Sequence, residues 1–204
     1  MDNNLLQQFN DTLADTVERV QASLVQIVNG RGAGAGTIWH PDGLIVTNAH
    51  VVRGRHGLHV ILPGGERLPA AVIAYDESLD LAALSVEAAG LPTIALGDSR
   101  QVRPGQWVMA VGHPWGVIGA VTSGVVIGAG AQLPEVGQMQ PGREWIALDL
   151  HMRPGHSGGP VVDSAGRLIG INTMITGPDV GFAIPVHVVK AFLKERLGTQ
   201  KMAV

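Results

Sequence analysis

The stretch Gly155-His156-Ser157-Gly158-Gly159-Pro160 is the most informative part of this chain, and the expected fold is built outward from it. Glycine accepts backbone angles that other residues avoid, so Gly155 permits a turn tight enough for its own amide and that of Ser157 to face one point. Two amides that converge in this way stabilise a developing negative charge. Gly158 and Gly159 then let the chain leave without a side-chain clash. The alternative interpretation is a glycine-rich hairpin loop with a solvent-exposed serine.

A serine hydroxyl becomes an effective nucleophile only when a nearby base takes its proton. His50 follows the apolar run Leu44-Ile45-Val46 and a small-residue turn, so we expect it at the end of a rigid strand, as a catalytic base requires. The seven other histidines are less well placed. Four of them are expected in turns, in loops, on the solvent face of a strand or at the start of a helix: His40, His56, His59 and His187. The other three lie in the motifs described below: His113, His151 and His156.

The acid that orients such a histidine is predicted at Asp80, which opens an otherwise apolar strand. A carboxylate at the edge of the core can accept the Nδ1–H of an imidazole and favour its charged form. Asp76 is the alternative, but it lies with Glu77 in the preceding turn and is expected to be solvated. The resulting chain order, His50 then Asp80 then Ser157, is that of the chymotrypsin triad and not of the subtilisin or α/β-hydrolase triads.

These three residues stand within a longer series of motifs that resembles the HtrA (high-temperature-requirement) family of trypsin-like serine proteases. The resemblance covers about residues 22–197 and includes no peptide-binding PDZ domain. The motifs, in chain order, are Thr47-Asn48-Ala49-His50-Val51-Val52, Asp80-Leu81-Ala82, Leu96-Gly97-Asp98-Ser99, Val111-Gly112-His113-Pro114-Trp115-Gly116, Val121-Thr122-Ser123-Gly124, Asp149 with Ser157, Ile169-Gly170-Ile171-Asn172-Thr173 and Gly181-Phe182-Ala183-Ile184-Pro185. The family usually carries asparagine where this chain has His113, Arg153 and His156.

The resemblance implies an all-β fold of chymotrypsin type, with two six-stranded antiparallel β-barrels and a helix at each end. The pattern of the chain agrees, because short β-rich runs divided by turns such as Pro41-Asp42-Gly43 fill residues 23–86 and return over 106–184. No helical segments alternate with these runs, which disfavours a parallel α/β fold. We therefore expect one protease domain over residues 1–204, divided into an N-terminal helix, a first barrel, a second barrel and a C-terminal helix at 1–22, 23–104, 105–185 and 186–198.

The resemblance also implies a serine endopeptidase that cleaves unfolded or flexible proteins through an acyl-enzyme, in protein quality control. The catalytic residues would be His50, Asp80 and Ser157, with an oxyanion hole at Gly155, His156 and Ser157. Substrate binding would fall to His151, Met152, Met174 and Ile175, whose character favours a small or medium aliphatic residue before the scissile bond and not Lys or Arg. Ordinary core packing is the alternative for these four. Two other functions stay open: a non-proteolytic peptide-binding or chaperone-like module of the same fold, and an esterase.

Composition narrows the partners. The net charge is −3, from 14 basic and 17 acidic residues, and no basic run occurs, so nucleic acid is not expected as a partner. With 46% hydrophobic residues the chain can bury a sizeable core. It has no cysteine, so no disulfide, thiolate metal site or cysteine nucleophile can form. The histidines are scattered, and no metal or other cofactor is expected even if His50, His151 and His156 converge.

The N-terminal segment shows the periodicity of a helix with one apolar face. Its apolar residues recur at steps of three and four: Leu6, Phe9, Leu13, Val17, Val20 and Leu24. This face either docks on the body of the chain or contacts another subunit, and the family it resembles commonly forms homotrimers through N-terminal segments. Neither a signal peptide nor a membrane span is visible. The protein is therefore expected in the cytoplasm if Met1 is the native start, and outside it if a signal segment has been removed.

Overall fold

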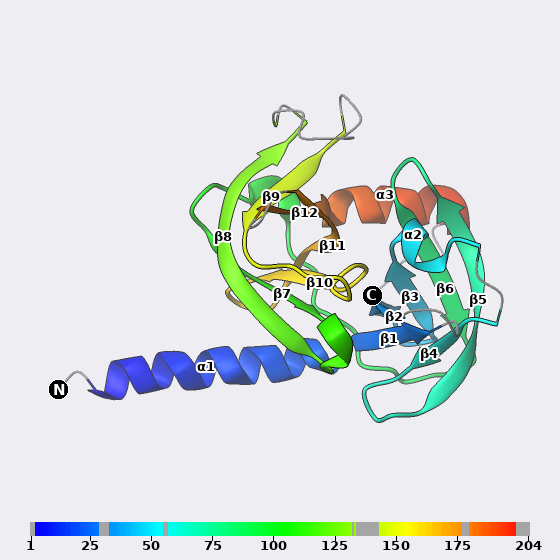
Figure 1. The fold of residues 1–204 in the computed structure, drawn as a ribbon, viewed down its shortest axis with the longest axis horizontal. Coiled ribbons are helices and arrows are strands. Elements are labelled where there is room, and N and C mark those ends of the chain that lie inside the picture. Colours follow the sequence, from blue (N-terminus) through cyan, green and yellow to red (C-terminus); the bar gives the residue numbers. More distant parts are fainter. Residues whose placement is uncertain are drawn as a thin grey trace.

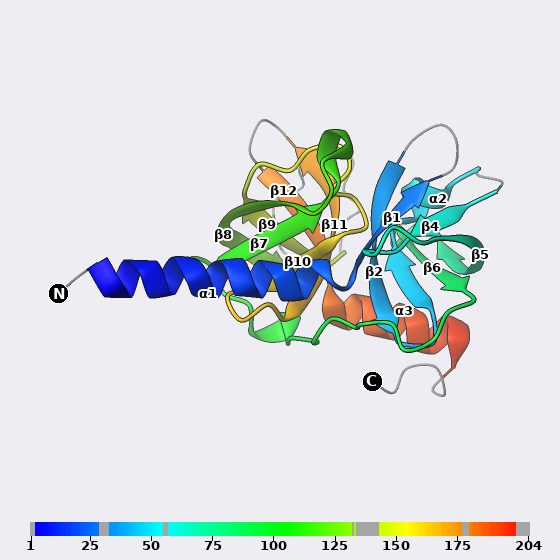
Figure 2. The same ribbon diagram turned by 90° about the horizontal axis from the view of Figure 1, so that it is seen from below.

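The fold consists of two closed β-barrels that lie side by side, with a helix at each end of the chain (Figures 1 and 2). It is given by a computed structural model that describes residues 3–28, 33–54, 57–131, 133, 143–176 and 180–198, with the backbone alone for residues 3 and 174–176. The first barrel contains β1 (Leu24–Val28), β2 (Ala33–His40), β3 (Leu44–Thr47), β4 (His59–Ile61), β5 (Arg67–Asp76) and β6 (Leu81–Val86). The second contains β7 (Trp107–Gly112), β8 (Ala120–Gly130), β9 (Trp145–Asp149), β10 (Pro160–Asp163), β11 (Leu168–Thr176) and β12 (Val180–Pro185).

The two barrels repeat one topology. The order of paired strands is β1-β2-β3-β6-β5-β4 in the first barrel and β7-β8-β9-β12-β11-β10, read in the same direction, in the second. All the pairings between these strands are antiparallel, and closure of each barrel pairs the strand edges that an open sheet would leave free. The predicted fold, with two six-stranded antiparallel barrels of chymotrypsin type, is confirmed.

Strands that face the other barrel are buried on both sides, which explains why apolar and polar residues do not alternate along their sequences. In β3, Ile45 belongs to the core of the first barrel, while Leu44 and Val46 face a separate cluster that lies between the barrels. The same division holds in β6, where Leu84 points inward and Leu81 outward. The intervening cluster also takes Met109 and Phe182 from the second barrel. Apolar contact across this interface holds the two halves of the molecule together.

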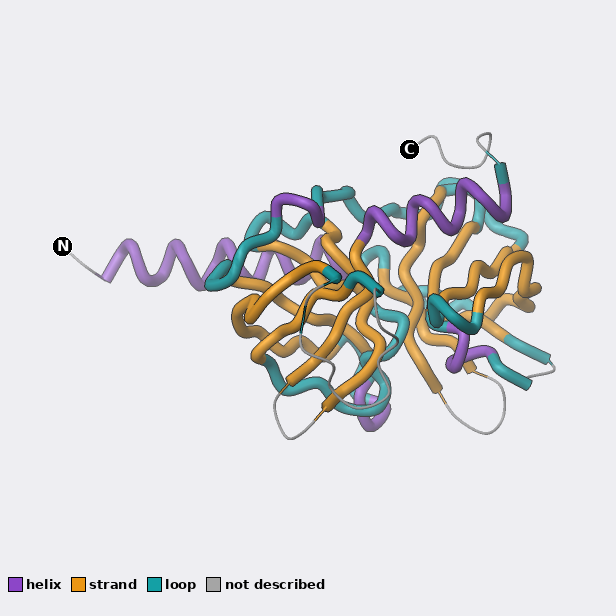
Figure 3. The backbone as a smooth tube through the Cα atoms, turned by 90° about the horizontal axis from the view of Figure 1, so that it is seen from above, coloured by secondary structure: helices purple, strands orange, loops and turns teal. Residues whose placement is uncertain are grey.

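Helix α3 (Val186–Leu197) closes the fold by spanning both barrels, as Figure 3 shows from above. It packs against β11 and β12 of the second barrel and against β5 and β6 of the first. Phe192 and Leu193 are the buried anchors of this contact. The helix ends at Gly198, whose φ of 74° is one that a side chain would disfavour.

Helix α1 (Asn3–Gln21) packs on the second barrel through its C-terminal half and projects beyond it (Figures 1 and 2). Thr16 and Val20 lie over the turn at Gly166, where a Cβ would stand 2.9 Å from Thr16 Cγ2. The predicted apolar face is therefore only partly docked. Leu6 and Phe9 are 66% and 56% exposed. The prediction was wrong for Leu24, which belongs to β1 because the chain turns at residues 22–23.

Three short helices of the described residues were not predicted, because each is a single turn within a connection. They are α2 (Ala49–Val52), η1 (Ser99–Gln101) and η2 (Pro114–Gly116). None of the described helices is long and apolar enough to cross a membrane. The division of the chain into one protease domain with the boundaries given above stays a prediction.

Candidate active site

His50 lies where β3 passes into α2, at the edge of the first barrel. Asn48 is fully buried and extended, with φ −81° and ψ 151°, and the chain turns into the single helical turn directly after it. The His50 side chain is 49% exposed, so one edge of its ring is open to a ligand. Its Nδ1 stands 2.9 Å from Asp80 Oδ2 and 3.0 Å from Oδ1. A proton on Nδ1 donates to this carboxylate, which leaves Nε2 as an acceptor.

Asp80 is the last residue of a turn and directly precedes β6. Its side chain is 18% exposed. Its carboxylate accepts the His50 backbone N–H at 3.0 Å, the His50 ring N–H and the Thr173 hydroxyl. Burial raises the pKa of the Asp80 carboxyl, but the hydrogen bonds and charge of His50, together with the Thr173 hydroxyl, outweigh it and hold the pKa below its ordinary value. Asp80 is therefore a part-buried, ionised acceptor for His50.

Ser157 is presented by the second barrel and held in place by the first. Its carbonyl accepts the amide of Ala35 at 2.9 Å, and the amide of Gly158 donates to the Asn172 carbonyl at 2.9 Å. Gly158 has a φ of 85°, and a Cβ there would stand 2.1 Å from Ala35 O and 2.3 Å from Thr47 Oγ1. Only glycine fits, because two strands of the first barrel occupy the space that a side chain needs.

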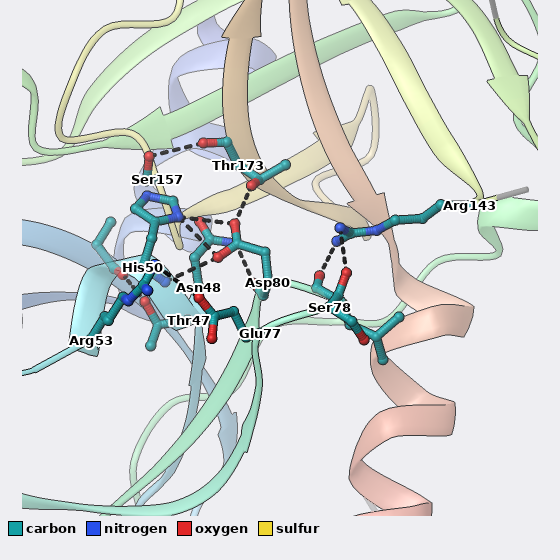
Figure 4. A network of polar contacts seen from close by, with 12 residues as sticks. Thr47, Asn48, His50, Arg53, Glu77, Ser78, Asp80, Arg143, Ser157 and Thr173 are labelled. Atoms are coloured by element: carbon teal, nitrogen blue, oxygen red, sulfur yellow. Dashed lines mark hydrogen bonds and ion pairs between the residues drawn. The ribbon is translucent and has the colours of Figure 1, made fainter. Parts of the chain in front are cut away.

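The Ser157 hydroxyl donates to the Thr173 carbonyl at 3.1 Å. Among the described residues, no hydrogen bond joins this hydroxyl to the His50 ring. Thr173 thus contacts both sides of the site, its hydroxyl bonded to Asp80 and its carbonyl to Ser157 (Figure 4). It is the extra residue of a β-bulge, since Asn172 pairs with Ala183 and Met174 with Phe182. Bulges of this kind re-aim side chains beside active sites.

The Gly155–Ser157 turn leaves two backbone amides without a protein acceptor. Gly155 has a φ of 108°, and within the described part of the chain its amide and that of Ser157 have no acceptor. The His156 amide, by contrast, donates to the Arg153 carbonyl at 3.0 Å. Two amides of the three predicted are therefore available to a ligand. The Gly155 carbonyl accepts the His113 amide at 2.9 Å, which fixes the orientation of the turn.

Two buried histidines support this turn from behind. His113 Nδ1 accepts the Gly119 amide at 3.2 Å, and His156 Nδ1 accepts the Arg153 amide at 3.0 Å. Burial lowers the pKa of both imidazoles; repulsion from a protonated His156 would add to the effect at His113, and the charge of Arg153 adds to it at His156. Both rings are thus held neutral. The Gly119 carbonyl accepts the Gln21 side chain of α1 at 2.7 Å, so the helix is hydrogen-bonded to the same loop.

The predicted substrate residues fall into two groups. Met152 is buried, and its Cε lies 2.4 Å from where a Cβ of Gly181 would be, so its side chain covers that glycine. His151, just before it, is exposed. Met174 and Ile175 belong to β11, but their side chains lie outside the described residues. Within the described ranges, no three His, Cys, Asp or Glu side chains are close enough together to hold a metal ion.

Comparison with known proteins identifies the family. A family model described as the trypsin-like peptidase domain matches residues 34–171. The chain belongs to this family. Among its relatives, it is 37% identical over 195 residues to serine protease HTRA1 of Xenopus tropicalis and 38% identical over 198 residues to the mitochondrial serine protease HTRA2 of Bos taurus. The predicted resemblance is confirmed.

The match to the HtrA-type relatives covers most of this chain but less of theirs. The two alignments take in 90% and 91% of the chain and 42% and 43% of the relatives. A solved structure described as the HtrA-type protease AlgW with tripeptide aligns with a TM-score of 0.81 and 31% identity, over 90% of this chain and 62% of that one. The chain therefore spans about two fifths of the length of the curated relatives it matches.

Proposed function

We propose that this HtrA-type domain is a serine endopeptidase, with His50 as general base, Asp80 as its orienting carboxylate and Ser157 as nucleophile. The observation that carries the proposal is the His50 Nδ1 to Asp80 contact of 2.9 Å, which leaves Nε2 as the proton acceptor. In the resting arrangement the serine proton is donated to Thr173. A rotation about the Cα–Cβ bond of Ser157 would transfer this hydrogen bond to His50, and catalytic hydrogen bonds often form only in the substrate complex.

The chemical steps follow from these positions. His50 takes the Ser157 proton as Oγ attacks the peptide carbonyl, and the amides of Gly155 and Ser157 stabilise the tetrahedral oxyanion. The protonated imidazole then gives its proton to the leaving amine, and an acyl-enzyme remains. Water, activated by the same imidazole, releases the new carboxylate. Asp80 stays ionised throughout and stabilises the imidazolium.

The proposed substrates are unfolded or flexible polypeptides with a small or medium aliphatic residue before the cleaved bond. Met152 supports this, because its buried side chain is apolar and covers Gly181. A carboxylate that would attract Lys or Arg is replaced by His151 at the position expected for the pocket base. A tripeptide is named with the solved relative AlgW, in line with a polypeptide ligand. Protein quality control remains the proposed role.

The proposed assembly and compartment come from the exposed end of α1 and from the names of the relatives. A homotrimer through α1 is supported by the exposed apolar side chains at its free end, which are Leu5, Leu6 and Phe9. A relative from Halomonas elongata, 41% identical over 163 residues, is named as a probable periplasmic endoprotease, and HTRA2 is named as mitochondrial. These names favour the extracytoplasmic alternative over the cytoplasmic one.

The proposed function is tested by labelling with a fluorophosphonate, which reacts with activated serines whatever their natural substrate. The wild type should be labelled and should cleave casein, while Ser157→Ala should do neither and should keep its melting temperature. The loss in casein cleavage should be roughly 10⁴- to 10⁶-fold. Casein cleavage by Ser157→Ala at the wild-type rate would refute the assignment. Hydrolysis of a small ester without casein cleavage would favour an esterase instead.

A further inference from the structure

Asp80 adopts a backbone conformation that is rare for its residue type. Its φ is 53°, in the left-handed region where a Cβ meets the backbone and where non-glycine residues are uncommon, although Asp tolerates it better than most. The direction in which the carboxylate leaves the chain depends on this angle. The carboxylate therefore reaches His50 only while the peptide groups on both sides of Asp80 are held.

Each of those peptide groups is held by a side chain. On the C-terminal side, the Asp80 carbonyl accepts Asn48 Nδ2 at 3.0 Å, a bond within the first barrel. On the N-terminal side, the Leu79 carbonyl, which shares a peptide group with the Asp80 amide, accepts Arg143 Nη2. Arg143 Nη1 also donates to the Ser78 carbonyl at 2.7 Å (Figure 4). One guanidinium thus binds two successive carbonyls directly before Asp80.

Arg143 belongs to the second barrel, two residues before β9 begins. Its guanidinium lies over the Trp145 ring, 4.0 Å from the centroid, and is part-buried. Burial lowers the pKa of Arg143 while the charges of Asp80 and Asp76 act against this, and an arginine stays protonated in any case. The planar fork presents its N–H groups in fixed directions, which a lysine ammonium does not. The guanidinium of Arg143 is thus held in place by the Trp145 ring while it binds the two carbonyls.

We propose that Arg143 is a positioning residue for the catalytic pair, which holds the Leu79–Asp80 peptide so that the Asp80 carboxylate stays aligned with His50. The inference rests on the proposed function. In this arrangement, Asp80 of the first barrel is aligned by Arg143, which lies in the segment that leads into β9 of the second barrel. It also assigns a role to a residue that lies in none of the sequence motifs.

The chain offers a matched control, because another arginine binds the same turn in a different way. Arg53 pairs with Glu77 at 2.8 Å, with side chains that are 69% and 61% exposed. This ion pair reaches a side-chain carboxylate and not a peptide carbonyl beside Asp80. An exposed pair of this kind contributes little. Arg53→Met should therefore leave the labelling rate unchanged while removing the same charge from the same turn.

The experiment is a double-mutant cycle read by the second-order rate of fluorophosphonate labelling, with kcat and KM for a peptide measured alongside. Arg143→Met should lower the labelling rate and kcat by roughly 10- to 100-fold, the effect of a small misplacement at a catalytic group, and leave KM within about twofold. In an Asp80→Asn background the same substitution should change the rate by less than about twofold, because the carboxylate it positions is gone.

Arg143→Lys provides the second variant, since it keeps the charge and most of the bulk but cannot span both carbonyls. It should also be labelled more slowly than the wild type. If Arg143→Met does not fold, Arg143→Lys takes its place in the double-mutant cycle. A wild-type rate in the folded variant, or an equal fractional loss with and without the Asp80 carboxylate, would overturn the positioning role. Failure of the wild type to be labelled at all would instead overturn the proposed function.

Discussion

Replacing Thr173 by valine should remove one hydrogen-bond donor from the Asp80 carboxylate and little else, because the two side chains have nearly the same shape. The carboxylate accepts from the His50 amide at 3.0 Å, from the His50 ring at 2.9 Å and from the Thr173 hydroxyl. Thr173 is 6% exposed, so water cannot readily take the place of the lost donor. The Thr173 carbonyl, which accepts the Ser157 hydroxyl, is part of the backbone and remains.

The size of the effect follows from the charge on the acceptor. A hydrogen bond to a charged group contributes about 1.5 to 3 kcal/mol. The Asp80 carboxylate is needed most in the transition state, where it stabilises the imidazolium of His50, so most of this loss should appear in the barrier. The expected decrease in kcat is roughly 10- to 150-fold. This is well short of the loss of about 10⁴-fold expected when the carboxylate itself is replaced.

The assay is steady-state hydrolysis of a peptide by the wild type, Thr173→Val and Thr173→Ser, with thermal melts of each. Thr173→Ser keeps the hydroxyl and should recover most of the rate, while KM should change little in either variant. If Thr173→Val equals the wild type in kcat, the hydroxyl does not support the acid. If Thr173→Ser is as slow as Thr173→Val, the loss comes from packing and the reasoning from hydrogen bonding fails.

Three further outcomes are expected. The folded protein keeps His113 and His156 neutral, so the stability that these two residues contribute is fully present above a pH of about 6.5, the ordinary imidazole pKa. This contribution falls as the pH drops through that value toward their lowered pKa values. A double His→Asn variant should therefore show a melting temperature that changes less between pH 7.5 and 5. Gly158→Ala should cost at least about 1 to 3 kcal/mol in a urea titration, since its Cβ would meet Ala35 O, whereas Gly64→Ala, with nothing within 4 Å, should be near neutral. Light scattering should report a smaller assembly without loss of fluorophosphonate labelling when serine replaces the exposed apolar residues of α1, which are Leu5, Leu6 and Phe9; an unchanged mass would refute a subunit contact there.

The barrels were predictable from the chain because their strands are short, closely spaced and divided by Gly and Pro turns. The positions of His50 and Ser157 could be expected for the same reason, since each stands in a motif whose residue types have a direct chemical meaning. The two glycines of the serine turn can be explained only with the structure, which shows what each approaches. Gly158 is required by the backbone of Ala35, which is distant in sequence.

Residues that act through long-range contacts gave no local signal. Thr173 stands in an apolar strand, and only the bulge opposite Ala183 and Phe182 turns it toward Asp80. Arg143 follows a stretch without regular periodicity, so neither its partners nor its place beside Trp145 could be foreseen. The left-handed conformation of Asp80 was equally hidden, because Asp in a turn usually adopts ordinary angles. The free end of α1 is the opposite case, because its sequence gives a clear helical periodicity. The surface that would cover its apolar residues does not lie within the described fold of this chain.

The close fit of Gly158 against β2 bears on when the molecule becomes reactive. Ser157 is anchored by Ala35, a residue from the other barrel, so a second barrel folded alone would lack the contact that fixes its serine turn. During synthesis, the first barrel emerges with a base and an acid but no nucleophile. The reactive centre would then form only after β11 has been made and both barrels have docked. A partly synthesised chain would be unable to cleave its neighbours, and two separately produced halves should regain labelling only at concentrations where they associate.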